Sequence, residues 1–187
     1  MSRPRPLLVT LAVLMLAACG TSSYRNYISP VYTGSTFNYA AGGRDLKVEV
    51  YGNPSNLDQQ SFAQAVVDAM QGHNPGQPTH LTLFPGPSAR PLYRVVIAFD
   101  PARPVNVSDL CQGPVETAQT TGKTQIRASL CQGGGALTSV RGEMPAGTTP
   151  DSPEFQSLMA AIARQLMPRE NPDDPRDGGF CRFVAAC

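Results

Sequence analysis

The sequence predicts an α+β fold, in which a small antiparallel-rich sheet of four to five strands carries two helices on one face. The order of segments along the chain is strand, helix, several strands and helix, which is typical of a two-layer domain. The strand-like segments are short and alternating or β-branched, whereas the two helical segments repeat apolar residues every three to four positions. With 17 glycines and 18 prolines in 187 residues, we expect short elements joined by long connections.

The predicted strands differ in how far they are buried. Residues 46–51, LKVEVY, alternate apolar and polar side chains, as a half-buried strand does. Residues 93–99, YRVVIAF, are the most apolar and are expected in the interior of the sheet. A run of three glycines at 133–135 predicts a tight turn between the last two strands. The five predicted strands are 46–51, 80–84, 93–99, 125–131 and 136–144.

The first helix is predicted over residues 57–71. Asn56 with Gln59 fits a capping box, and Gly72 suits the position just after a helix end. One side of this segment is apolar, which is expected to pack on the sheet. The residues on that side are Phe62, Ala65, Val66, Ala69 and Met70.

The second helix begins after Asp151 or Ser152, either of which can cap it, and ends at Pro168. Pro153 fits the first turn, and the charge of Glu154 complements the positive end of the helix dipole. The predicted buried side consists of Phe155, Leu158, Met159, Ile162 and Leu166.

The chain divides into four parts. Residues 1–18 are expected to be a signal peptide, and 19–45 a tether and extended lead-in, because 24–45 show no sustained period. Residues 46–167 form the α+β domain. Residues 168–187 are a linker rich in proline and aspartate followed by a short apolar tail, and the linker is too polar to bury itself.

The N-terminus carries a targeting pattern. Arg3 and Arg5 precede the uncharged run 7–18, which is too short to cross a bilayer but has the length of a signal-peptide core. The following residues, Leu16-Ala17-Ala18-Cys19-Gly20, resemble a bacterial lipobox. The resemblance implies that Cys19 becomes the N-terminus and carries acyl chains. The alternative is an ordinary secretory signal in which the cysteine is incidental.

The same resemblance implies a location. Aspartate after the lipidated cysteine is the usual signal for retention in the inner membrane, and this chain has Gly20 there. We therefore expect an outer-membrane lipoprotein that faces the periplasm, held to the membrane by its N-terminal lipid. Residues 20–23 are expected to act as a flexible tether.

The chain contains five cysteines. With Cys19 acylated, Cys111, Cys131, Cys181 and Cys187 remain, and an exported domain is expected to use them in disulfides. Three pairings are possible. We favour Cys111 with Cys131 and Cys181 with Cys187, because each pair is close in sequence. The alternative is that some of these thiols stay reduced and buried.

No catalytic, cofactor-binding or metal-binding motif stands out. Gly122-Lys123-Thr124 resembles the end of a phosphate-binding loop, but Thr117 occupies the place of the first glycine. The two histidines, His73 and His80, are too few for a zinc site. The formal net charge of +1 argues against a nucleic-acid partner. We therefore predict no catalytic residues, no metal and no cofactor.

Five arginines lie on or beside the predicted strands: Arg90, Arg94, Arg103, Arg127 and Arg141. Together they could form a basic face for anionic lipid or glycan headgroups. The simpler interpretation, which the sequence favours, is a set of separate arginines that face solvent.

The element order is similar to that of auxiliary lipoproteins of transport and lipopolysaccharide-assembly systems, although no residue motif is shared. The hypothesis is a non-enzymatic, lipid-anchored binding or assembly module whose partner is an envelope protein, lipid or glycan. One alternative is a structural or surface-antigen lipoprotein. Another is a periplasmic hydrolase that uses His73 or His80 with scattered carboxylates.

Overall fold

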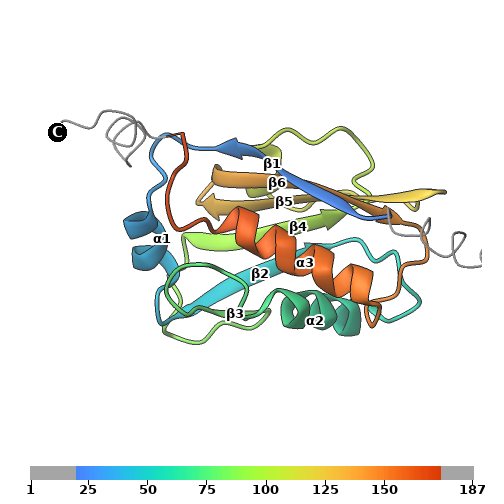
Figure 1. The fold of residues 1–187 in the computed structure, drawn as a ribbon, viewed down its shortest axis with the longest axis horizontal. Helices are drawn as coiled ribbons and strands as arrows, with labels where there is room; N and C mark the ends of the chain where they lie inside the picture. Colours follow the sequence, from blue (N-terminus) through green and yellow to red (C-terminus); the bar gives the residue numbers. More distant parts are fainter. Residues whose placement is uncertain (1–19, 174–187) are drawn as a thin grey trace, which may run out of the picture.

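The computed structural model describes residues 20–173, which form an α+β fold with a six-stranded mixed sheet and three α-helices (Figure 1). The predicted fold class is therefore confirmed, with more elements than expected. The strands are β1 Ser22–Ile28, β2 Asp45–Tyr51, β3 His80–Thr82, β4 Tyr93–Phe99, β5 Lys123–Gln132 and β6 Gly135–Pro145. The helices are α1 Gly34–Ala41, α2 Gln59–Met70 and α3 Pro153–Leu166, with a 3₁₀ turn, η2, at Asp109–Cys111.

The sheet has the strand order β1-β6-β5-β4-β2-β3. The pairs β1–β6, β6–β5 and β5–β4 are antiparallel, whereas β2 pairs in parallel with both β4 and β3. The interior position predicted for residues 93–99 is correct, because β4 lies between β5 and β2. The parallel half arises because the chain crosses over through α2 between β2 and β3.

The prediction that residues 19–45 form only a tether and an extended lead-in was wrong, because this segment contains β1 and α1. β1 is an edge strand whose register shifts between Arg25 and Tyr27, so its apolar residues do not alternate cleanly. α1 is short, with Thr33 as its cap, and it is held by the buried ring of Phe37. The tether predicted at 20–23 is correspondingly shorter, since β1 already begins at Ser22.

Both predicted helices are present, and α2 begins later than expected. Asp58, not Asn56, is its cap, and the Asp58 carboxylate accepts from the backbone N–H of Gln60 and Ser61 at 3.0 and 2.9 Å. Gly72 follows the helix with a φ of +77°, which favours glycine. At α3 the structure selects Ser152, whose hydroxyl accepts from the Phe155 N–H.

The main core lies between the sheet and the helices α2 and α3, which pack side by side over one face (Figure 1). The Phe62 ring of α2 meets the rings of Phe99 and Phe155 edge-on, with centroids 4.9 and 6.1 Å apart. Burial of each such side chain contributes roughly 1.5–3 kcal/mol, so this three-ring contact joins both helices to β4.

The opposite face of the sheet is covered in part by residues 101–122, the connection between β4 and β5. A second, smaller core lies beneath this segment. Its buried members are Val96, Ala98, Leu110, Cys111 and Cys131. The second face of the sheet therefore obtains at least part of its cover from the chain itself.

Residues 168–173, the described start of the predicted linker, are held to the body at Pro168 and Asn171, which are buried, while the other four residues are exposed as predicted. This segment runs back toward β1 and α1 (Figure 1), and the Tyr32 hydroxyl donates to the main-chain oxygen of Pro168 at 2.5 Å. Asn171 is buried, and its side-chain amide donates to the carbonyls of Ser29 and Tyr32 at 3.3 Å. The polar Asn171 is buried here because its amide supplies donors to buried backbone carbonyls. The apolar tail lies outside the described residues.

Candidate functional site

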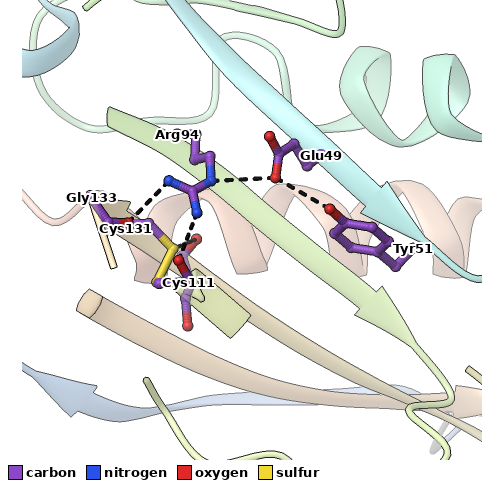
Figure 2. The surroundings of a disulfide bond; sticks show 7 residues. Glu49, Tyr51, Arg94, Cys111, Cys131 and Gly133 are labelled. Atoms are coloured by element: carbon purple, nitrogen blue, oxygen red, sulfur yellow. Dashed lines mark hydrogen bonds and ion pairs between the residues drawn. A yellow bond between two sulfur atoms is a disulfide. The ribbon is translucent and has the colours of Figure 1, made fainter. Parts of the chain in front are cut away.

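The predicted disulfide between Cys111 and Cys131 is present and joins the 3₁₀ turn of the covering segment to β5 (Figure 2). Cys19, Cys181 and Cys187 lie outside the described residues. Arg94 of β4 reinforces the disulfide with a guanidinium that donates to the main-chain oxygens of Cys111 at 2.7 Å and Gly133 at 3.0 Å. One side chain thus holds both the covering segment and the β5–β6 turn.

The charge of Arg94 is balanced by Glu49 of β2, whose carboxylate lies 3.3 Å from the Arg94 Nε (Figure 2). Lys47 pairs with the same carboxylate at 2.8 Å, and the Tyr51 hydroxyl donates to it at 3.4 Å. Burial, then the Glu49 charge, raises the pKa of Tyr51 above its ordinary value. These groups pair their charges and hydrogen bonds with one another. The cluster therefore holds Arg94 in place, and Arg94 in turn holds the covering segment.

Three of the five arginines considered for a basic face are occupied elsewhere. Arg94 is largely buried in the cluster just described. The Arg90 guanidinium lies 3.6 Å from the ring centroid of Tyr39 and donates to the Tyr39 carbonyl. Arg103 pairs with Glu116 on the exposed surface of the covering segment. Only Arg127 and Arg141 are neighbours in the sheet.

Arg127 of β5 lies directly opposite Arg141 of β6, which lies opposite Tyr24 of β1. In the next row, Ser129 lies opposite Ser139, which lies opposite Tyr27. Directly opposed residues share a face of the sheet, as do alternate residues of one strand. These six residues therefore share one side of the sheet across three strands, which we call the arginine face, and within it Ser129 and Ser139 are buried.

The arginine face points away from the helices. A Cβ on Gly142 would lie 3.3 Å from the Ile162 side chain of α3, and the Thr138 hydroxyl donates to the Leu166 carbonyl of the same helix. Successive residues of a strand point to opposite sides, so Arg141 and Ser139 project from the other side of the sheet.

In the described part of the chain, the two guanidinium groups of the arginine face form no ion pair. Within residues 20–173, no carboxylate forms an ion pair with Arg127 or Arg141, and the nearby Glu143 pairs with Lys123 at 3.2 Å. Within the same described residues, Arg127 donates to the Ile126 carbonyl and the Gln125 side chain. Burial, then the positive charge of Arg141, lowers the pKa of Arg127 below its ordinary value.

Two polar atoms on this face are buried without a hydrogen-bond partner in the described part of the chain. They are the Arg141 Nε and the hydroxyl oxygen of Ser129, a residue with no exposed surface. Buried polar groups normally have partners, and leaving one unsatisfied costs about 1–3 kcal/mol. The site therefore combines concentrated positive charge with unused hydrogen-bonding capacity.

The two histidines have separate partners. His80 Nδ1 lies 2.9 Å from the Asp45 carboxylate, whereas His73 contacts Arg164 at 3.4 Å. His80, followed by the Gly86 N–H, lowers the pKa of Asp45. Among residues 20–173, no group of three metal-ligating side chains comes together. None of the helices described has the length and apolar character needed to span a bilayer.

Comparisons with known proteins add little to this picture. No family model and no curated protein matches the chain. Among solved structures, two crystal forms of the PelC dodecamer from Paraburkholderia phytofirmans are similar to it, at 11% and 12% sequence identity. They cover 80% and 79% of this chain and 99% and 97% of PelC, each with a TM-score of 0.41. Likeness at this level carries no argument about function or assembly.

Proposed function

We propose that this protein is a bacterial envelope lipoprotein, anchored in the outer membrane through acylated Cys19, that acts without catalysis as a periplasmic binding or assembly module. The observation that carries the proposal is the sequence Leu16-Ala17-Ala18-Cys19 after an uncharged run of signal-peptide length. Two or more acyl chains give stable membrane attachment, which one chain alone does not provide.

The position of β1 in the chain implies that the link between the acylated cysteine and the folded domain is short. Cys19 precedes Ser22, the first residue of β1, by three positions, which extended chain spans in roughly 10 Å. Gly20 already lies against the body, since a Cβ there would come within 2.9 Å of the Pro145 ring. Acylation at Cys19 therefore holds the end of the sheet near Pro145 at the membrane surface.

The disulfide supports export. The Cys111–Cys131 bond holds the covering segment on the second face of the sheet, so the fold benefits from an oxidising compartment. The Gly20 that follows Cys19 favours the outer over the inner membrane. The arginine face supplies a surface for an envelope partner, which favours a binding role over a purely structural one.

The proposal is tested by expressing the full chain and its Cys19→Ser variant in a Gram-negative host supplied with radiolabelled palmitate. The intact chain should incorporate label and fractionate with membranes. The variant should carry no label and leave the membrane fraction, yet keep its internal disulfide on non-reducing gels. Ser22→Ala, which leaves Cys19 in place, is the matched control and should behave as the intact chain. Absence of label from the intact chain, or label retained by Cys19→Ser, would refute the anchor.

A further inference from the structure

We propose that the arginine face binds a phosphate group carried on a saccharide, with Arg127 and Arg141 holding the phosphate and Tyr24 and Tyr27 contacting the sugar. The proposal names a ligand class for the binding role proposed above and rests on that role. Its test does not require acylation of Cys19, so the two proposals can fail separately.

The placement of the two guanidinium groups suits a tetrahedral oxyanion. Arg127 and Arg141 are a cross-strand pair, and the Cβ atoms of such pairs lie about 4.5–5.5 Å apart. Each guanidinium presents planar N–H donors that match two oxygens of a phosphate. Two such groups from neighbouring strands can therefore grip different oxygens of one phosphate.

The unliganded pair is electrostatically unfavourable. The two positive charges repel each other, and the nearby Glu143 carboxylate, which also pairs with Lys123, offsets this repulsion only in part. A bound anion would neutralise this repulsion and give the buried Arg141 Nε an acceptor. The unpartnered Ser129 hydroxyl lies one row along β5, buried beneath the same face, so it adds a polar group below the pair and not a contact at the surface.

The aromatic side chains extend the surface beyond the phosphate. Tyr24 and Tyr27 of β1 are 56% and 37% exposed, and they stand opposite Arg141 and Ser139. A tyrosine presents an apolar ring and a hydrogen-bonding hydroxyl at little entropic cost, which suits a sugar that has both apolar faces and hydroxyl groups. A phospholipid headgroup would use the arginines without needing the rings.

The test measures binding by the full chain, purified in a neutral detergent, using isothermal titration calorimetry. The ligands are glucose 6-phosphate, glucose, inorganic phosphate and vesicles containing phosphatidylglycerol. The variants are Arg127→Gln, Arg141→Gln, Arg141→Lys and Tyr24→Ala. Arg164→Gln, on α3 and therefore on the other side of the sheet, removes the same charge and is the control.

Glucose 6-phosphate should bind more tightly than inorganic phosphate, and glucose should not bind measurably. Either glutamine variant should weaken binding about tenfold to a hundredfold, as expected for lost hydrogen bonds to a charged group. Arg141→Lys should also lose most of the affinity, because lysine lacks the planar fork. Tyr24→Ala should remove the advantage of the sugar phosphate over inorganic phosphate, and Arg164→Gln should change nothing.

Folding of each variant is checked by its urea midpoint in phosphate-free buffer, where removal of one repelling charge should cause no loss of stability. Absence of glucose 6-phosphate binding at millimolar concentration would overturn the proposal. So would unchanged affinity in folded Arg127→Gln and Arg141→Gln, or binding to the vesicles alone.

Discussion

The guanidinium of Arg94 donates to the main-chain oxygen of Cys111 at 2.7 Å, and the side chain of this same cysteine forms the disulfide with Cys131. A covalent bond and a charge-assisted hydrogen bond therefore fix the same turn of the covering segment to two strands of the sheet. Because this segment covers the second core, the Arg94 hydrogen bond helps to keep the apolar side chains beneath it buried.

Replacement of Arg94 by methionine should destabilise the protein by roughly 1.5–3 kcal/mol, because the Cys111 and Gly133 carbonyls lose their donor. Lys47→Met removes the other cation on Glu49 and, as a more exposed ion pair, should cost no more than about 1 kcal/mol. Urea denaturation measures both. Equal effects in the two variants would show that Arg94 acts only through the charge of Glu49.

Removal of the disulfide in a Cys111→Ala, Cys131→Ala double variant should cost about 3 kcal/mol. The bond closes a loop with a sequence separation of 20, and the entropy that such a loop removes from the unfolded chain corresponds to about 3 kcal/mol. The unfolding midpoint in urea, measured with and without a reductant, checks this. The reductant should lower the unfolding midpoint of the parent chain. It should change the midpoint of the double variant much less, because that variant has no Cys111–Cys131 bond to reduce.

Tyr32 predicts a loss of stability in alkali. Burial raises the pKa of its hydroxyl, although the Arg25 charge partly opposes the effect. The unfolded chain ionises near the ordinary value of 10.0 while the folded chain keeps the proton, so the contribution of Tyr32 is complete below pH 10 and declines above it. Tyr32→Phe should flatten this decline, seen in urea midpoints from pH 8 to about 11. An unchanged alkaline slope would assign the loss to other groups.

Asp45 predicts a dependence on acid pH of the opposite sense. The hydrogen bonds from His80 and from the Gly86 N–H lower its pKa, so its contribution is present above the ordinary aspartate value and is lost as pH falls through the lowered value. Titration followed by carboxyl ¹³C NMR should place Asp45 below ordinary aspartates. His80→Ala should raise its pKa, whereas His73→Ala should not. Identical titration curves in both variants would exclude His80 as the cause.

The sequence was sufficient where local signals agreed with packing. β4 and α3 were predicted nearly to their ends, because an apolar run and a capped apolar stripe each satisfy local preference and burial together. β1 and α1 were missed because their formation depends on neighbours. The bulged edge strand needs β6 as its partner, and the eight-residue helix depends on burial of Phe37.

The candidate site was only partly predictable. Arg127 and Arg141 belonged to the arginines selected from the sequence, but their direct opposition depends on the β5–β6 register. Arg94 was grouped with them because nothing in the local sequence shows that Glu49, on a strand far along the chain, balances its charge. The burial of Ser129 and of the Arg141 Nε is likewise a tertiary property.

The most direct test of the proposed anchor is mass spectrometry of the N-terminal peptide from the protein isolated from bacterial membranes. The expected peptide begins at Cys19 and carries the mass of a diacylglyceryl group with a further acyl chain. A peptide that begins elsewhere, or one that contains Cys19 as an unmodified thiol, would contradict the proposed anchor.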